Sequence, residues 1–258
     1  MEIVKREYIE LDAQSRLSIL IHALSKRGKS TLSATAPPPI LVLDAEGSWR
    51  FIPVRKCIWN PLTEALPTYD GTWDVCIVPV TDWGTIETVY QWLTQQQTCF
   101  TSLVIDSITE IQRRCKNNMK GTEALKIQDW GILLAIMDKV LRGFRDITLY
   151  PSANLRCVVF VAETRRGDDG RYIPYMQGQI AVSIPYWVDI CGYLYADYEL
   201  DNNGQPTVEI RKLWIGPHNE FESGERVQGR LGYYQTIKKP DSYSVGNDIT
   251  YWMQKIYS

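Results

Sequence analysis

The sequence predicts an α/β fold: a mostly parallel central sheet covered by helices and extended by antiparallel strands near the C-terminus. Two observations predict this class. Short runs that are apolar throughout, and therefore suit strands buried on both faces, alternate with segments of helical spacing. From about residue 189 the pattern changes to two longer strand-like runs around an Asn202-Asn203-Gly204 turn, which favours an antiparallel pair.

The elements can be placed in order along the chain. Apolar runs predict five buried strands, at 16–22, 40–43, 75–79, 102–105 and 157–162. Helical spacing or composition predicts helices at 29–36, 85–97, 128–144 and 249–257, and strand patterns predict the antiparallel pair at 189–200 and 207–215. No repeat or linker interrupts this order, so we expect one domain over 1–258 with a β-rich extension at about 189–258.

Composition excludes several classes of protein. The chain has 258 residues, of which 45% are hydrophobic and 22% charged, the balance of an ordinary globular protein. A net charge of −2 argues against coating nucleic acid by bulk charge but leaves room for a local basic groove. The apolar runs are too short to cross a bilayer, and charged residues follow Met1, so we expect neither a membrane partner nor a secretory signal.

The cysteines do not suggest a metal site. There are six, none in a C-x-x-C pair, and only two histidines accompany them, so zinc is not expected. Without a secretory signal we interpret the cysteines as free thiols of a cytoplasmic protein.

The sharpest motif lies between the first strand and the first helix. Ala23 to Ser30 reads A-x-x-x-x-G-K-S, the phosphate-loop pattern with Ala in place of its first Gly. In this pattern backbone N–H groups face the phosphates, Lys29 reaches the β- and γ-phosphates, and the Ser30 hydroxyl binds Mg²⁺. The residues expected to contact nucleotide are Ala23, Ser25, Lys26, Arg27, Gly28, Lys29, Ser30 and Thr31. The plain alternative is a chance helix start capped by Ser30 or Thr31.

Two apolar runs end in acidic residues. Asp106 ends the run Leu103–Ile105 and is expected to order Mg²⁺ beside Ser30. Glu46 follows the run at 40–43 and is a candidate general base for the attacking water, with Asp44 as its structural neighbour. Alone, such acids more often cap helices or face solvent; their order after a phosphate loop favours the catalytic interpretation.

That order resembles the RecA/RadA recombinase ATPase core. More closely, the chain is similar to the short phage-encoded RecA-like ATPases of the single-strand-annealing (Sak) group, through Gly28–Thr31, LDAEG at 43–47, VIDS at 104–107, VVFVAE at 158–163 and a late segment holding Arg226 and Arg230. The resemblance implies ATP and Mg²⁺ as cofactors, with Lys29, Ser30, Glu46 and Asp106 in the roles given above. It also implies a homo-oligomeric ring or filament in which Arg226 and Arg230 complete the ATP site of a neighbouring subunit.

The same resemblance places a polar γ-phosphate sensor at the end of the strand at 157–162. This chain has Glu163 there, a carboxylate that would repel the phosphate, so Gln177 and Gln179 are alternative sensors.

RecA-like cores hold single-stranded DNA with two loops, and two segments match in order. Residues 113–121 are expected to form the first loop and 165–172 the second. Basic side chains would track phosphates, and Tyr172 or Tyr175 could stack on bases. The DNA-binding candidates are Arg113, Arg114, Lys116, Lys120, Arg165, Arg166 and Arg171. The alternative is a pair of solvated charge runs.

These features predict an ATPase, stimulated by DNA, that binds single-stranded DNA and assists strand annealing or exchange in phage recombination. It would work in the host cytoplasm if phage-encoded, with a single-strand binding protein as a further candidate partner. A second hypothesis is a P-loop NTPase motor or loader, either of helicase type or acting on a protein partner. A third is a scaffold with a degenerate nucleotide site, which Ala23 and Glu163 favour and the pairing of Glu46 with Asp106 disfavours.

Overall fold

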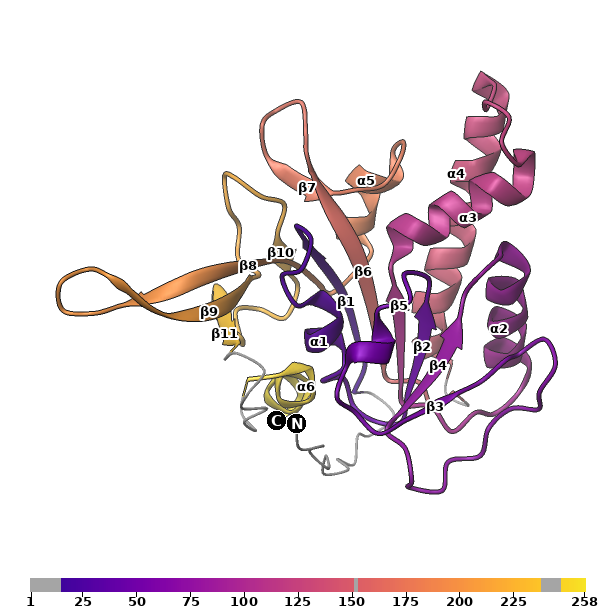
Figure 1. Ribbon diagram of the computed structural model, residues 1–258, viewed down its shortest axis with the longest axis horizontal. Coiled ribbons are helices and arrows are strands. Elements are labelled where there is room, and N and C mark those ends of the chain that lie inside the picture. The colour runs from indigo at the N-terminus through magenta and orange to yellow at the C-terminus, as the bar shows by residue number, and fades with distance from the viewer. Residues whose placement is uncertain (1–14, 151–152, 238–246) are drawn as a thin grey trace.

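Residues 15–150, 153–237 and 247–258 are described by the computed structural model. Their strands join in one eleven-stranded sheet, whose main path runs β11-β9-β8-β1-β6-β5-β2-β4-β3. The sheet crosses the whole molecule, with a long hairpin projecting at one end (Figure 1). The sheet and its helical cover confirm the predicted α/β class.

The first part of the chain forms the parallel portion of the sheet. β1 pairs with β6, β6 with β5, β5 with β2, β2 with β4, and β4 with β3, all in parallel. These strands are β1 (Leu17–Ala23), β2 (Ile40–Asp44), β3 (Lys56–Ile58), β4 (Val75–Pro79), β5 (Ser102–Asp106) and β6 (Cys157–Arg166). β1, β2 and β5 are buried along their whole length, which explains why their sequences are continuous apolar runs.

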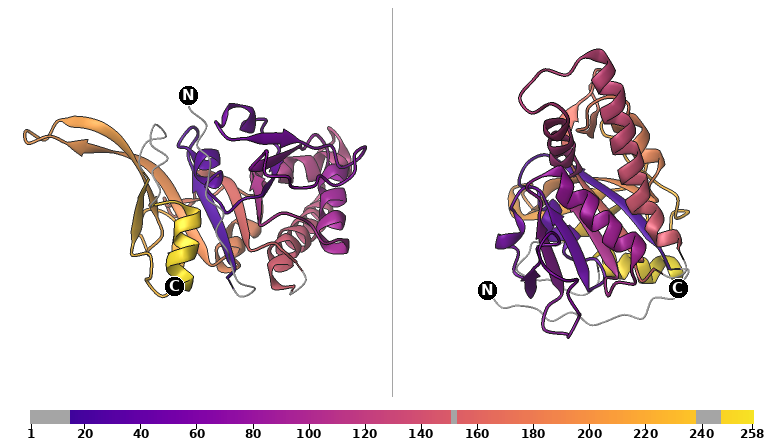
Figure 2. Two further views of the ribbon diagram at one scale, coloured as in Figure 1. Left: turned by 90° about the horizontal axis from the view of Figure 1, so that it is seen from below. Right: turned by 90° about the vertical axis from the view of Figure 1, so that its right-hand side faces the viewer.

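Helices cover both faces of this sheet, as predicted. α2 (Trp83–Gln95), α3 (Ile108–Lys120) and α4 (Ile127–Asp146) pack on one face, in a hydrophobic cluster that includes Ile86, Ile111 and Met137. α1 (Lys29–Ser33) and α6 (Ile249–Tyr257) pack on the other face, with Leu32 and Trp252 in a second cluster. Figure 2 gives two further views of this arrangement. No described helix is long and apolar enough to span a membrane.

The later strands extend the same sheet. β8 (Ile190–Leu200) lies parallel to β1 and forms an antiparallel hairpin with β9 (Pro206–Trp214), which pairs with β11 (Tyr234–Ile237). The outer part of this hairpin stands clear of the body (Figures 1 and 2). β7 (Tyr172–Pro174) pairs with β6, β10 (Gly224–Glu225) pairs with β8, and α5 spans Ile180–Ser183. A single domain over 1–258 stays a prediction, because that range includes residues outside the described part.

One predicted loop is wrong: residues 113–120 belong to helix α3. Ser107 caps this helix by accepting a hydrogen bond from the backbone N–H of Glu110 at 3.3 Å. Ile108, Ile111 and Cys115 are buried along one face, at the spacing of an amphipathic helix. The basic residues that suggested a loop lie around the remaining faces. The non-helical connection is the short segment that follows, between α3 and α4.

Candidate functional site

The chemistry-bearing residues gather where three parallel strands end. Asp44 at the end of β2 pairs in register with Asp106 at the end of β5, and β1 leads directly into the phosphate loop before α1. Because parallel strands end at the same edge, segments distant in sequence meet there. Helix α1 stops at Ser33, three residues before the predicted end, and two turns follow it before the prolines at 37–39.

Asp106 is the centre of this group. Its Oδ2 accepts hydrogen bonds from Ser30 Oγ at 2.5 Å and from the indole Nε1 of Trp49 at 2.8 Å. The pKa of Asp106 is raised to about 6, chiefly by burial and also by the charges of Glu46 and Asp44, while the hydrogen bonds from Ser30 and Trp49 oppose the rise. The structure therefore brings together the two residues predicted to serve Mg²⁺.

Asp44 and Glu46 play different parts. Asp44 is buried and accepts hydrogen bonds at 3.2 Å from the backbone N–H groups of Ser48 and Trp49. It thereby holds the 3₁₀ turn Trp49–Phe51, from which the indole reaches Asp106. Glu46 is exposed, and its Oε1 accepts a hydrogen bond of 2.5 Å from Ser107 Oγ. Within the described part of the chain the other oxygen of Glu46 accepts no hydrogen bond, so it can hold a water.

The phosphate loop encloses a cavity of about 330 Å³. Gly28 has φ of +94°, a conformation that glycine adopts without strain. The Lys29 ammonium donates to the carbonyl oxygens of Ala23 at 3.3 Å and Leu24 at 3.5 Å, so it folds back over its own loop. The cavity is lined by Ser25, Lys26, Arg27, Gly28, Lys29, Ser30, Thr31, Glu46, Ser48, Ile52 and Arg211.

Glu163 pairs in register with Ala23, the first residue of the loop. Its carboxylate faces Arg113 of α3, with Nη2 to Oε2 at 3.2 Å and Nη1 to Oε1 at 3.3 Å. Its backbone N–H donates to Thr109 Oγ1 at 3.0 Å, which also ties it to α3. Of the alternative sensors, Gln177 is held at its backbone by the Gln112 side chain, also on α3, and Gln179 lies at the start of α5.

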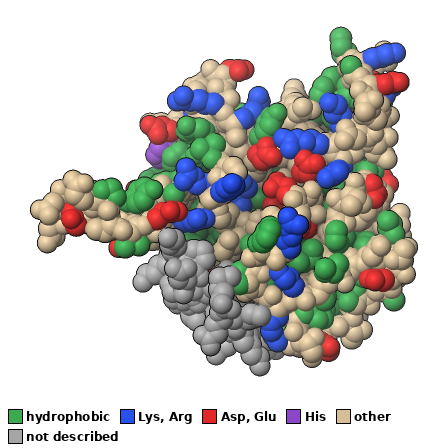
Figure 3. Space-filling view, viewed as in Figure 1, with side chains coloured by type: hydrophobic (Ala, Val, Ile, Leu, Met, Phe, Trp, Pro, Cys, Tyr) green, Lys and Arg blue, Asp and Glu red, His purple; other side chains and the backbone are tan. Residues whose placement is uncertain are grey.

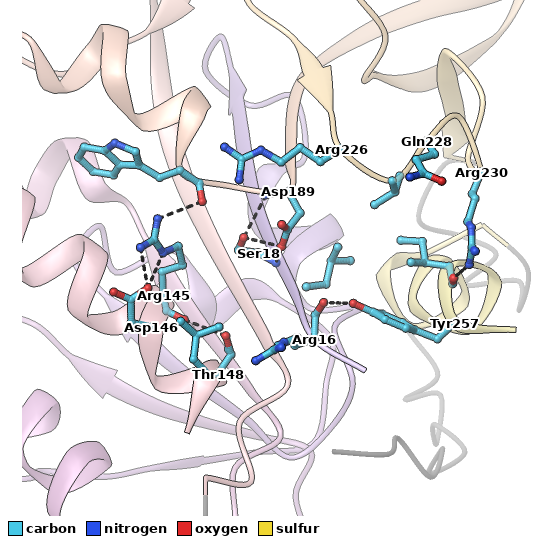
Figure 4. Close-up of a pocket in the computed structure, with 15 residues that line it drawn as sticks. Arg16, Ser18, Arg145, Asp146, Thr148, Asp189, Arg226, Gln228, Arg230 and Tyr257 are labelled. Atoms are coloured by element: carbon cyan, nitrogen blue, oxygen red, sulfur yellow. Dashed lines mark hydrogen bonds and ion pairs between the residues drawn. The ribbon is translucent and has the colours of Figure 1, made fainter. Parts of the chain in front are cut away.

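Arg226 and Arg230 lie near the first residues of β1, whereas the phosphate loop follows the last residue of that strand. Figure 4 shows both arginines around a pocket with Arg16 and Ser18. They line a cavity of about 590 Å³ together with Arg16 and Ser18, at the start of β1. Arg226 donates to the carbonyl oxygen of Tyr186, and Arg230 to that of Ile256. The loop follows the last residue of β1, a strand of seven residues, which spans roughly 20 Å at 3.3 Å per residue. The structure does not bring these arginines to the phosphate loop of their own chain.

The predicted DNA-binding residues divide into two groups. On α3, Arg113 pairs with Glu110 and Glu163, and Arg114 also pairs with Glu110. Lys116 is partly buried on the same helix, and Lys120 lies 3.5 Å from Asp129.

The second group lies on the hairpin of β6 and β7. Arg165 lies over the ring of Tyr175 and Arg166 over that of Tyr172, at 5.9 and 5.6 Å. Arg171 pairs with Asp169 and Glu222. Figure 3 shows basic and acidic side chains interleaved across the middle of this face.

Two residues that the sequence did not single out belong to the site. Trp49 is fully buried and supplies a hydrogen bond to Asp106; its nearness to Asp44 in the chain was the available clue. Arg211 comes from β9 and lines the phosphate-loop cavity. No local pattern marks it, because only the pairing of β8 with both β1 and β9 brings it there.

The donor set suits a magnesium–nucleotide complex. A serine hydroxyl and a buried carboxylate adjoin each other, and two further carboxylates lie close enough to raise the pKa of Asp106. Among the described residues no group of three or more His, Cys, Asp or Glu side chains is placed to hold a metal by itself. Mg²⁺ bound mainly by phosphates and waters needs fewer protein ligands.

All six cysteines are free thiols, as predicted, and lie in the described part of the chain. Burial raises the pKa of four of them strongly, which makes them poor nucleophiles and poor metal ligands: Cys76, Cys115, Cys157 and Cys191.

Comparison with known proteins agrees with this geometry. No curated protein matches the sequence. A family model described as an AAA domain matches residues 15–227, which include the phosphate loop, Glu46, Asp106 and the strands that carry them. The chain therefore belongs to the AAA domain family, with a P-loop NTPase type of core.

Proposed function

We propose that the protein binds and hydrolyses ATP with Mg²⁺ and uses this cycle to bind single-stranded DNA and assist strand annealing or exchange. The observation that carries the ATPase part is the 2.5 Å hydrogen bond between Ser30 and Asp106. It joins the phosphate-loop helix to the strand-end carboxylate, as a metal–nucleotide site requires. The AAA domain match supports the same class.

The side chains take distinct roles in this proposal. Lys29 turns from the carbonyl oxygens of its own loop to the β- and γ-phosphates. Ser30 and Asp106 hold Mg²⁺, which neutralises charge on the phosphates when bound. Glu46, fixed by Ser107, accepts the proton of the attacking water.

The DNA part is supported by the hairpin of β6 and β7. Arg165 and Arg166 are exposed and lie over tyrosine rings without a charged partner among the described residues. Guanidinium groups beside aromatic rings suit phosphate contacts next to stacked bases. By contrast, the ion pairs of Arg113 and Arg114 on α3 would have to break before those residues met phosphate. We therefore place the main DNA contacts on the hairpin.

The oligomer is part of the same proposal. Because Arg226 and Arg230 lie at the far end of β1 from their own loop, the nucleotide phosphates that they could meet are those bound by another copy of the chain. A ring or filament with ATP between subunits would use them in this way.

Hydrolysis is tested with wild type, Lys29→Ala and Glu46→Gln, each with and without single-stranded DNA. Wild type should hydrolyse ATP faster with DNA, and Lys29→Ala should not bind ATP. Glu46→Gln should bind ATP with Mg²⁺ but hydrolyse it roughly 10²–10⁴-fold more slowly. A wild-type rate in Glu46→Gln would move the base to another carboxylate. ATP hydrolysis that ignores DNA, or that drives duplex unwinding, would favour a loader or a motor instead.

DNA binding is tested by fluorescence anisotropy of a labelled single strand across a salt series, with ATP and Mg²⁺. Arg165→Ala with Arg166→Ala should weaken binding equally for all sequences and reduce the salt slope by about 0.7 per lost contact. Arg142→Ala, which removes a half-exposed cation from α4, is the control. A triple Ala variant of Arg113, Arg114 and Lys116 measures the share of α3. If the double and the triple variant both bind with wild-type affinity and salt slope, the proposed DNA surface is wrong.

A further inference from the structure

Arg211 lies beside the phosphate loop, although its strand, β9, comes about 180 residues after the loop in the chain. The pairing of β1 with β8 ends at His22 and Tyr193, and Arg211 pairs with Ala196 farther along β8. The hairpin of β8 and β9 thus continues past the end of β1, alongside the loop. The guanidinium rests directly on Gly28: a Cβ placed on that glycine would collide with Arg211 Nη1. The φ of +94° favours glycine at this position, and the missing side chain leaves the space that the guanidinium occupies.

The guanidinium lacks satisfactory partners within the described part of the chain. The side chain is only 19% exposed, and its Nε is buried without a hydrogen-bond partner there. Its Nη2 makes one long contact of 3.5 Å with Glu209 Oε1. A buried donor left unpaired is costly, and phosphate oxygens match the fork of a guanidinium better than any other biological anion except carboxylate.

The surrounding charge favours the same ligand. Arg211 faces a cavity that is also lined by Lys26, Arg27 and Lys29, whereas Glu46 is the one acid among the described residues that line it. Four cations around one space call for a polyanion. Glu163 of β6 cannot bind the phosphates in place of Arg211, because it is a carboxylate and is paired with Arg113.

We propose that Arg211 binds the phosphate chain of the nucleotide held by its own subunit. This inference rests on the proposed nucleotide binding. The guanidinium would leave its contact with Glu209 and donate to phosphate oxygens in the cavity. The position of this hairpin side chain would then depend on whether nucleotide is bound.

The test is titration calorimetry of ATP with Mg²⁺ on wild type, Arg211→Met and Arg211→Lys. Met keeps the aliphatic stem, so folding is protected. We expect Arg211→Met to bind ATP roughly 10- to 150-fold more weakly, the loss of hydrogen bonds to a charged group, and Arg211→Lys to recover part of it. Lys212→Met is the matched control: it removes the next cation of the strand, which pairs with Asp197 and lies outside the cavity lining. It should bind like wild type.

The outcomes separate the two proposals. Wild type that binds no ATP overturns the proposed function and this inference with it. Wild type that binds ATP while Arg211→Met binds it equally well overturns only the role of Arg211. A mixture of Lys29→Ala with Arg211→Met subunits tests which copy is served. Restored hydrolysis would place Arg211 at a neighbour's site and overturn the proposal, whereas the same low rate as in the separate variants would support it.

Discussion

Acid should destabilise the protein through His22, a buried residue in the central strand. His22 is fully buried, and in the neutral ring Nε2 donates to the Glu222 carbonyl at 2.7 Å while Nδ1 accepts from Thr164 Oγ1 at 3.0 Å. Both ring nitrogens are thus used without a charge. The pKa of His22 is lowered to about 4, chiefly by burial and in smaller part by the nearby Lys29 charge, while the hydrogen bond to the Glu222 carbonyl opposes the fall.

The magnitude follows from the shift. The unfolded chain binds a proton at His22 below pH 6.5, and the folded protein only below about pH 4. Between those values the unfolded state holds more protons, so the free energy of unfolding falls as the pH falls. A fall of the His22 pKa from 6.5 to about 4 corresponds to about 3 kcal/mol of unfolding free energy, lost between pH 6.5 and 4. This contribution is fully present above pH 6.5.

Asp106 acts in the opposite direction over nearly the same range. Its pKa of about 6 in the folded protein lies above the ordinary value of 3.8, so the folded state holds the extra proton. On acidification from pH 6 to 3.8 this group adds about 3 kcal/mol to the free energy of unfolding. The two effects nearly cancel, and the wild-type curve alone would hide both.

A single variant separates the contribution of His22 from that of Asp106. His22→Gln keeps an N–H donor for the Glu222 carbonyl but does not titrate. Urea unfolding followed by tryptophan fluorescence at pH 7, 6, 5 and 4 gives the free energy of unfolding of both proteins. The difference between variant and wild type should move by about 3 kcal/mol in favour of the variant as the pH falls. A difference that stays constant over the series would refute the assignment of a depressed pKa to His22.

Three further outcomes are expected. Trp49→Phe removes the indole donor to Asp106 and should cost about 2 kcal/mol of unfolding free energy in urea, with no such loss if Asp106 is also changed to Asn. Ile111→Ala should cost roughly 2–5 kcal/mol by the same measurement, because α3 buries this residue; a solvated loop would lose almost nothing. Lys29→Ala should leave the circular dichroism spectrum and the urea midpoint near wild type, since among the described residues its ammonium donates to two loop carbonyls alone; an unfolded variant would contradict this.

The sequence predicted most of the elements because burial on both faces of the sheet produces continuous apolar runs. A strand covered on both sides must be apolar at every position, and β4 and α6 have the bounds that were expected. Helix α3 was missed for the reverse reason. Its buried face includes Gln112, whose side chain is satisfied by the backbone of Gln177 on a distant segment. This polar residue interrupts the apolar stripe on the inner face, and the basic residues between Arg113 and Lys116 favour a DNA-binding loop instead.

The residues of the candidate site were likewise predictable only where a local pattern carries them. Residues carried by one local pattern, such as Lys29 and Ser30, could be named from spacing, because strand, loop and helix are consecutive. Arg211 could not, since its place depends on β8 bridging β1 and β9. Trp49 is intermediate: its position follows from two hydrogen bonds to Asp44 in a turn that the sequence does not announce.

The strand order also fixes when the phosphate loop can work during synthesis. β1 is made first among the described strands, yet its partners in the sheet are β6 and β8, which begin at Cys157 and Ile190. Chains emerge at about 5–20 residues per second, and pairing between such distant segments is slow. A nascent chain that has passed Asp106 contains every residue of the motif but offers β1 no neighbour to pair with. ATP therefore cannot assist early folding, and a ribosome-bound fragment ending before β6 should not bind it.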